Sequence, residues 1–375
     1  MKFLHTSDWH LGMSFQNTSL IDDQRVFIEQ LHNIIKENNV DAVIIAGDVY
    51  DSSVSSSSAI ELYNMAITKI CFEENITTFV IAGNHDGAAR LASLNKLLAR
   101  TNMYVTGKLV RDITPVTIDD TAFWSIPYFN TDEVKALYPE KAEEISSYGM
   151  AAMTVCDDIR SKMDKTKKNV VIAHMFVAGS ELSDSDRSAR VGTSNMVPKS
   201  VFEGFEYVAL GHIHRPQQVT EHIRYCGSPL VYSFGSEEKY EKSVTIVDTE
   251  KMSRVTIPIV PLHKMRTIEG KFEEIMNMPD SDDYVNVLFK DIYVGADIIA
   301  RVREHFPNAM EIRGKISELS INGESSISSD DINSMSDEEI IISFLKEKYL
   351  YEPNEAQVAL IKKAIEISEE EVDLS

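Results

Sequence analysis

Five stretches of this sequence end in residues that can bind a metal ion. In each stretch a run of apolar or small residues predicts a buried strand, and a carboxylate, amide or imidazole side chain follows it. The central stretch is Val43–Ala46, which leads into Gly47 and Asp48. The side chains of metal-binding type after the five strands are Asp8, His10, Asp48, Asn84, His174, His212 and His214.

These residue types suit a pair of divalent cations. Carboxylate, amide and imidazole ligands without a thiolate favour manganese, iron or zinc over copper or an iron–sulfur cluster. A carboxylate can bridge two ions, and ions ~3.5–4 Å apart can hold the attacking and leaving oxygens of a phosphoryl displacement. The pKa of bound water can fall to about 7, which yields hydroxide at neutral pH. The pattern therefore indicates hydrolysis of a phosphate ester.

Asp48 is the residue that we expect two ions to share. Strand ends that meet at one edge of a sheet are where α/β proteins bind ligands. A single Asp-x-His or His-x-His pair occurs by chance, and isolated histidines such as His32 and His305 are ordinary surface or core residues. His5 lies within a predicted strand, so we expect it to be structural. Only the five groups together indicate a metal centre.

The segments between the first strands predict helices. Apolar residues recur at helical spacing from Val26 to Ile35, from Leu62 to Ile70 and from Leu91 to Leu98. A serine tract, Ser52–Ser58, precedes the second of these helices, and its last serine can cap a helix that starts near Ala59. The first third of the chain therefore alternates strands and helices.

The next part of the chain contains more and shorter predicted strands, such as 121–126, and a helix at about 151–163. Two prolines then predict a boundary near His263. We therefore expect residues 1–265 to form an α/β domain in which mixed sheets pack as a sandwich flanked by helices.

Two smaller units follow in the sequence. Residues 266–323 alternate strand and helix patterns and predict a small α/β domain. A polar linker, Glu324–Asp330, separates this domain from residues 336–368, where two apolar stripes flank a break at Pro353 and predict a helical hairpin. The stripes contain Ile340, Ile341, Phe344, Leu345 and Tyr349, followed by Val358, Ile361 and Ile365.

The composition limits the class of protein. The 375 residues carry a formal net charge of −22, from 37 Lys and Arg against 59 Asp and Glu, which alone argues against nucleic acid as the main partner. Bound metal ions and local basic loops can still make one face of an acidic protein favourable for binding nucleic acid. Three widely spaced cysteines predict no disulfide framework and favour a reducing cytoplasm. We expect no signal peptide, because a strand starts almost at once, and no membrane span.

The strand-end motifs resemble the signature of the calcineurin-like metallophosphoesterases. The resemblance rests on Asp8-x-His10, Gly47-Asp48, Gly83-Asn84-His85-Asp86, His174 and Gly211-His212-x-His214. The segments 5–12, 207–216 and 227–229 are similar to nuclease subunits of bacterial nuclease–ATPase complexes within that superfamily, and the similarity extends over essentially the whole chain. The resemblance implies a four-layer metallophosphoesterase sandwich of two mixed β-sheets, a small capping domain and the terminal hairpin.

The resemblance also implies a role for each motif residue. His85 matches the family's catalytic histidine, which lies outside the ligand set and stabilises the transition state or protonates the leaving oxygen. Asp86 is expected to orient His85, or alternatively to cap a turn. The expected cofactor is two divalent ions, with Mn²⁺ preferred. One ion is assigned to Asp8, His10, Asp48 and His214, and the other to Asp48, Asn84, His174 and His212.

The roles of other residues near the motifs stay open. Asp51 stands where archaeal and eukaryotic relatives have a second histidine, so a mechanism that needs two histidines does not carry over. Arg90 and Arg215 could meet phosphates or form structural ion pairs.

For partners, the resemblance implies DNA and an SMC-like ATPase subunit. The hairpin would grip the coiled coil of that ATPase, and the small domain would cap the DNA site. We also expect a homodimer within a heterotetramer, through helices 62–70 and 91–98, which could equally be ordinary core helices. The hairpin could likewise fold on a core of its own.

Three functions are compatible with the sequence. The first is a manganese-dependent DNA nuclease, an exonuclease on duplex ends and an endonuclease on single strands or hairpins, that acts with an ATPase in DNA repair, recombination and replication. The second is a stand-alone phosphoesterase for small phosphodiesters or phosphoproteins, and the third is a scaffold with an inactive site. The complete ligand set argues against the third, and the cap and hairpin argue against the second. We therefore expect the nuclease, in the cytoplasm.

Overall fold

The structure is a computed structural model that describes residues 1–16, 18–186, 196–314, 336, 338–342, 353, 357–363 and 365. Its backbone contacts divide the chain into two compact units. The first unit takes Met1–Ile268, Pro279–Val287 and Arg301–Glu311, and the second takes Glu269–Met278, Leu288–Ala300 and Ile312–Ser375. Among the described residues, no helix combines the length and the apolar character needed to cross a membrane.

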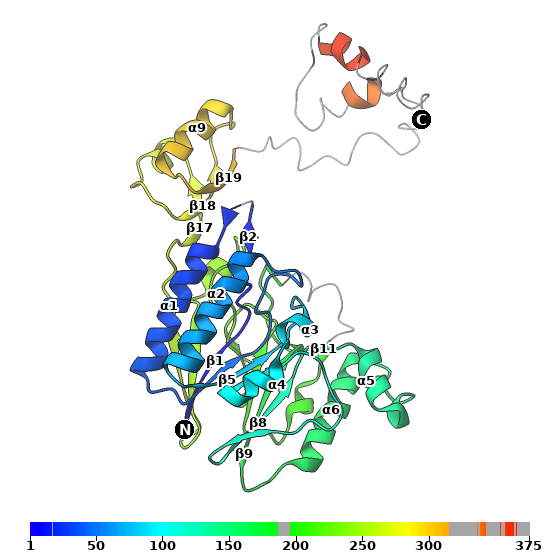
Figure 1. Ribbon diagram of the computed structural model, residues 1–375. Coiled ribbons are helices and arrows are strands. Elements are labelled where there is room, and N and C mark those ends of the chain that lie inside the picture. The colour runs from blue at the N-terminus through cyan, green and yellow to red at the C-terminus, as the bar shows by residue number, and fades with distance from the viewer. Residues whose placement is uncertain are drawn as a thin grey trace. The chain divides into compact units, whose positions relative to one another are not determined.

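The first unit contains two six-stranded mixed sheets (Figure 1). The first sheet has the order β16-β15-β1-β4-β5-β6. Its strands β1, β4, β5 and β6 are parallel, and β15 is antiparallel to both of its neighbours, β1 and β16. The strands span Lys2–Thr6 (β1), Ala42–Ile45 (β4), Thr77–Ile81 (β5), Met103–Thr106 (β6), Ser243–Asp248 (β15) and Ser253–Pro258 (β16).

The second sheet has the order β13-β14-β12-β9-β8-β7. Four parallel strands form its centre, and the outer strands β13 and β7 are antiparallel to their neighbours. Its strands span Val116–Ile118 (β7), Thr121–Ile126 (β8), Lys168–His174 (β9), Tyr207–Gly211 (β12), Gln217–Gln218 (β13) and Ile223–Tyr225 (β14). Two-stranded ribbons are formed by Ser14–Phe15 (β2) with Thr18–Ser19 (β3) and by Phe176–Val177 (β10) with Met196–Val197 (β11).

Side chains that alternate along the strands separate the layers. In β4, Val43 and Ile45 belong to the core beneath the helices α1 and α2, whereas Ile44 belongs to the core between the two sheets. In β9, Ile172 faces the other sheet, and Val171 packs in a third core with helices α5 and α6. The helices span Ile21–Glu37 (α1), Ser57–Ile67 (α2), Thr131–Leu137 (α5) and Tyr148–Lys162 (α6).

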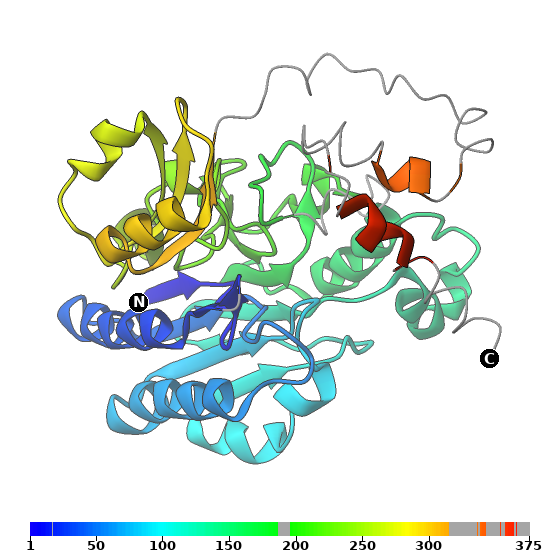
Figure 2. The same ribbon diagram turned by 90° about the horizontal axis from the view of Figure 1, so that it is seen from above.

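Figures 1 and 2 show the same layering in two views, with α1 and α2 side by side on one sheet and α5 and α6 on the other. The predicted four-layer sandwich of two mixed sheets flanked by helices is therefore confirmed.

Two predicted helices differ in detail. Ser56, rather than Ser58, caps α2, because its side chain accepts a hydrogen bond from the Ala59 amide. The helix predicted over 91–98 is broken into Ala88–Leu91 (α3) and Asn95–Leu98 (α4), because Leu94 between them has a left-handed backbone with φ of 60°.

The helices considered for dimerisation differ in exposure. In α2 and the π-helical turn Thr68–Glu73 after it, Leu62 and Ile70 are buried in this protein's own core. In contrast, Leu94 and Leu97 are exposed. The segment 62–70 therefore packs in the core of this protein, and dimerisation stays a prediction.

A smaller sheet has the order β17-β18-β19, with strands Met265–Gly270, Tyr284–Phe289 and Ala309–Arg313. Helices Phe272–Met276 (α8) and Ala296–His305 (α9) connect these strands in sequence. The division between the two compact units passes through all three strands, so the domains 1–265 and 266–323 stay predictions. In the predicted hairpin, residues 338–342, 357–363 and 365 are helical, while Phe344, Leu345 and Tyr349 lie outside the described residues.

Candidate metal centre

Backbone hydrogen bonds join the loops that follow β1 and β4. The amides of Asp8, His10 and Leu11 donate to the carbonyls of Gly47, Asp48 and Val49, at 2.9–3.0 Å. Asp8, His10, Asp48 and His212 all have positive φ, an uncommon conformation for residues with a side chain that is often found at functional sites. The paired loops therefore hold buried polar side chains in a fixed arrangement at the strand ends.

One group of candidate ligands contains Asp8, His10 and His214, whose donor atoms lie within 4.8 Å of one another. The Nε2 atoms of His10 and His214 are 3.1 Å apart. The Asp8 Oδ1 atom accepts the amide of His212, and the buried Asp8 Oδ2 atom has no hydrogen-bond partner. A buried carboxylate oxygen without a partner is costly, and a cation would satisfy it.

A second group contains Asp48, His174 and His212, again with donor atoms within 4.8 Å. Asn84 joins it, because its Oδ1 atom lies 3.0 Å from His174 Nε2 and 2.9 Å from His212 Nδ1. His174 Nδ1 lies 2.9 Å from the Ala46 carbonyl. Donation to that carbonyl fixes the proton on Nδ1 and leaves Nε2 free to face Asp48 and Asn84.

Asp48 lies between the two groups. Its Oδ2 atom is 3.2 Å from His174 Nε2 and 3.8 Å from His10 Nε2, while Oδ1 accepts the amide of His85. Burial lowers the pKa of His174, but Asp48, Asp8 and the hydrogen bond to the Ala46 carbonyl together outweigh burial and raise that pKa to about 9. Burial raises the pKa of Asp8 to about 6, against the opposing effect of His174. The centre thus concentrates charges that divalent ions would balance.

The donor set fits two divalent ions. All seven predicted ligands converge at the strand ends, in two groups with Asp48 between them. The groups match the distribution that the family resemblance implies. Their assignment as ligands stays a prediction, which the partnerless Asp8 oxygen and the close His10–His214 contact support.

The structure changes the expected role of Asp86. Its carboxylate accepts the backbone amides of Val49, Tyr50 and Gly83, so it organises the loops around Asp48. The Nδ1 atom of His85 lies instead 2.9 Å from the Asp51 carbonyl. These contacts favour the alternative of a turn cap for Asp86, and they make the Asp51 carbonyl the candidate partner that orients His85.

His85 and Asp51 lie at a small cavity of about 80 Å³. The rings of His85 and His10 are 4.9 Å apart, and His10 Nδ1 is 3.3 Å from an Asp51 carboxylate oxygen. The cavity is also lined by Met13, Asp48, Ser185, Asp186, His212 and His214.

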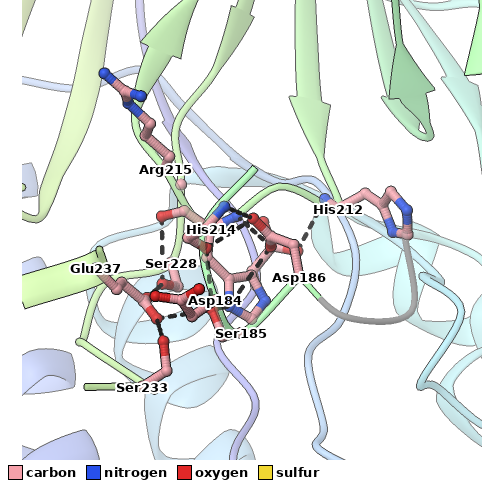
Figure 3. A network of polar contacts seen from close by, with 12 residues as sticks. Asp184, Ser185, Asp186, His212, His214, Arg215, Ser228, Ser233 and Glu237 are labelled. Atoms are coloured by element: carbon pink, nitrogen blue, oxygen red, sulfur yellow. Dashed lines mark hydrogen bonds and ion pairs between the residues drawn. The ribbon is translucent and has the colours of Figure 1, made fainter. Parts of the chain in front are cut away.

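Sequence reasoning missed a polar network behind His214 (Figure 3). Ser185 bonds to the His214 ring, and Asp186 accepts the His214 amide. Ser185 and Asp186 lie in the polar loop after β10, where Ser and Asp are common and give no sequence signal. The two arginines considered for phosphate binding have structural partners: Arg90 donates to the Ser53 carbonyl, and Arg215 pairs with Glu181.

Two family models and a curated relative match this sequence. Residues 1–216 match the family model of calcineurin-like phosphoesterases, and residues 261–349 match the model described as the type 5 capsule protein repressor C-terminal domain. The D subunit of the nuclease SbcCD from Staphylococcus epidermidis (strain ATCC 12228 / FDA PCI 1200) is 30% identical over 354 residues, which covers 92% of this chain and 93% of that protein.

Solved structures are more distant. A protein of Thermus thermophilus has a TM-score of 0.39 and 9% identity, and a dimetal phosphatase from Danio rerio has a TM-score of 0.37 and 11% identity. Each match covers 69% of this chain and 99% of the solved chain. TM-scores this low support no comparison of details.

The chain therefore belongs to the calcineurin-like phosphoesterase family, whose members are hydrolases that bind divalent metal ions. Within that family it is a homologue of SbcD, the nuclease component of the SbcCD complex. Both levels of the resemblance predicted from the sequence are confirmed.

Proposed function

We propose that this chain is a metal-dependent DNA nuclease that hydrolyses phosphodiester bonds as the SbcD component of an SbcCD-type complex. The observation that carries the proposal is the convergence of two ligand groups on Asp48, at the strand ends of a phosphoesterase fold. The relative from Staphylococcus epidermidis is named as a nuclease subunit, and the similarity covers nearly the full length of both chains.

The residues divide into those that hold ions and one that acts on the substrate. Asp8, His10 and His214 would hold one ion, Asn84, His174 and His212 the other, and Asp48 would join both. When bound, two divalent ions supply an activated water and neutralise charge on the phosphate oxygens. His85 lies beside the ligands, with Nδ1 donating to the Asp51 carbonyl. Nε2 then carries a lone pair in the neutral ring, and in the doubly protonated ring it can donate to the phosphate or the leaving oxygen.

Manganese is the ion that we propose for both sites. Imidazole, amide and carboxylate ligands without thiolate suit Mn²⁺, and the described cysteines do not belong to either ligand group. Zinc and iron accept the same ligands, so a metal titration has to decide among them.

The proposed partners are duplex or single-stranded DNA and the ATPase subunit SbcC. The net charge of −22 is unfavourable for DNA, so we propose that SbcC supplies much of the basic surface. The helical segments within 336–368 would bind the coiled coil of SbcC, and two copies of each chain would form a heterotetramer in the cytoplasm.

The test is a nuclease assay on duplex ends and on hairpin DNA, with and without SbcC and with Mn²⁺, Zn²⁺ or Fe²⁺. We expect manganese-dependent cleavage of both substrates that increases with SbcC. Efficient hydrolysis of small phosphodiesters or phosphoproteins, with no cleavage of DNA even in the complex, would instead support a stand-alone phosphoesterase.

A further inference from the structure

A buried ion pair lies behind the candidate metal centre. Glu237, in the short helix η6 (Glu237–Lys239), pairs with Lys242, and both side chains are almost fully buried. Lys242 Nζ also donates to Ser228 Oγ at 2.8 Å and to the His214 carbonyl at 3.0 Å. A buried ion pair requires good geometry and further hydrogen bonds to offset its desolvation, and this pair has them.

Ser185 connects this ion pair to the His214 ring. Its Oγ atom lies 2.7 Å from Glu237 Oε2 and 2.7 Å from His214 Nδ1 (Figure 3). Burial raises the pKa of Glu237, but the charge of Lys242 and the hydrogen bonds from Lys242 and Ser185, together with the nearby His214, outweigh burial and lower that pKa to about 2. Glu237 is therefore an ionised acceptor at neutral pH.

The direction of each hydrogen bond follows from the proton count. An ionised carboxylate can only accept, and a serine hydroxyl has one proton to donate. Ser185 must then donate to Glu237, so its oxygen accepts the Nδ1–H of His214. That tautomer leaves the His214 Nε2 lone pair directed at His10 Nε2, 3.1 Å away, where the first ligand group converges.

The same network fixes the backbone of His214. Asp186 Oδ1 accepts the His214 amide at 3.0 Å, and Lys242 donates to the His214 carbonyl. Ring and backbone are thus held together, which limits rotation of the imidazole away from the ligand group.

We propose that Ser185, held by the Glu237–Lys242 ion pair, is a positioning residue that fixes His214 in the Nδ1–H tautomer for metal binding. This inference rests on the metal centre proposed above. Removal of a residue that hydrogen-bonds to a metal-ligating histidine typically weakens metal binding by about 10–100-fold.

Ser185→Ala and Ser233→Ala form a matched pair of variants. Ser233 donates to the same Glu237 oxygen, at 2.9 Å, while Ser185 is the hydroxyl that reaches the His214 ring. Both changes remove one hydrogen bond to Glu237, but only Ser185→Ala removes the acceptor of the His214 proton. Ser185→Thr keeps that acceptor.

The measurement is Mn²⁺ binding to the full-length chain by equilibrium dialysis, together with the melting temperature of the metal-free protein. We expect Ser185→Ala to weaken one of two Mn²⁺ sites by about 10-fold or more. Ser233→Ala and Ser185→Thr should stay within about 2-fold of wild type, and all three variants should melt alike without metal.

Equal Mn²⁺ affinities for Ser185→Ala and Ser233→Ala would overturn the proposed role of Ser185. A lower metal-free melting temperature of Ser185→Ala with unchanged Mn²⁺ affinity would also overturn it, because the role would then be structural only. Wild-type protein that binds no divalent ion would contradict the metal centre itself, a different result from either of these.

Discussion

His85 is half-buried, and its Nδ1 atom faces the backbone carbonyl of Asp51. The candidate ligands His10, His174 and His214 are buried, and their rings face one another or a carboxylate. We propose that His85 acts on the substrate and that these buried histidines hold ions.

The variant His85→Ala should therefore bind both ions and lose most of its turnover. General acid catalysis or transition-state stabilisation by one side chain typically contributes about 10²–10⁴-fold. The measurements are Mn²⁺ content and the rate of DNA cleavage on the same preparation. A loss of Mn²⁺ from this variant would show that His85 is a ligand.

His5 is a residue whose role is structural. Its Nδ1 atom lies 3.1 Å from the Tyr207 hydroxyl, and Nε2 lies 3.2 Å from the Leu210 carbonyl, so it joins the two sheets. Burial, assisted by the charge of Arg224, lowers the pKa of His5 to about 3. As the pH falls below about 6.5, His5 binds a proton in the unfolded chain but stays neutral in the folded protein. The free energy of unfolding therefore falls.

His5→Gln should remove this part of the acid sensitivity. Between pH 6 and pH 4, the unfolding free energy of the wild type should fall more steeply than that of the variant, by up to about 1.4 kcal/mol per pH unit. Urea unfolding of both proteins with a chelator present measures the two slopes. Parallel curves would mean that His5 titrates normally in the folded state.

At the scale of elements, close contact between strand ends depends on glycine. A Cβ on Gly83 would lie 2.2 Å from Asp48 Oδ1 and 2.4 Å from the Asp48 amide, and one on Gly47 would lie 2.3 Å from His174 Nδ1. The loops can therefore approach only where these side chains are absent.

Gly83→Ala should displace Asp48 and weaken Mn²⁺ binding at both sites, with a loss of stability of about 1–3 kcal/mol. Gly270→Ala is a suitable control, because its Cβ would meet only side-chain atoms at 3.3 Å or beyond. Dialysis with Mn²⁺ and thermal unfolding compare the two variants. Normal Mn²⁺ affinity in Gly83→Ala would show that the loop can relax without moving Asp48.

The sequence predicted elements well where the periodic signal is local. Strand β18 and helix α9 lie within 266–323, where the sequence predicts alternating strand and helix patterns, and the seven ligand candidates come together because they follow five strands that end at one edge. The break at Leu94 was missed, because apolar spacing does not report a left-handed residue. Ser185, Glu237 and Lys242 were missed because their contacts join distant segments through residue types that are common on surfaces.

At the scale of the whole molecule, the proposed ligands and the C-terminal hairpin are separate in sequence. Every candidate ligand precedes Arg215, and the predicted hairpin lies in a segment from Asp330 onward with thirteen acidic and four basic residues. Catalysis and association with SbcC should therefore be separable.

Removal of all residues after Gly323 should leave Mn²⁺ binding and hydrolysis of a small chromogenic phosphodiester intact. Association with SbcC should be lost or greatly weakened.

Two point variants should also weaken association with SbcC, because an unpaired charge is costly to bury in an interface. They are Ile361→Glu and Phe344→Glu, the latter on the predicted stripe but outside the described residues. Pull-down with SbcC measures the association, and thermal unfolding measures the stability of each variant. Reduced stability with intact SbcC binding would place the hairpin in this protein's own core.

The Mn²⁺ stoichiometry of Asp48→Ala, measured alongside DNA cleavage, tests whether Asp48 joins two ions. Because Asp48 lies between both ligand groups, its removal should abolish tight binding at both sites and cleavage with them. The wild type should bind two ions, and His174→Ala should lose activity as well. Two tightly bound ions and manganese-dependent cleavage in Asp48→Ala would contradict the shared-carboxylate centre.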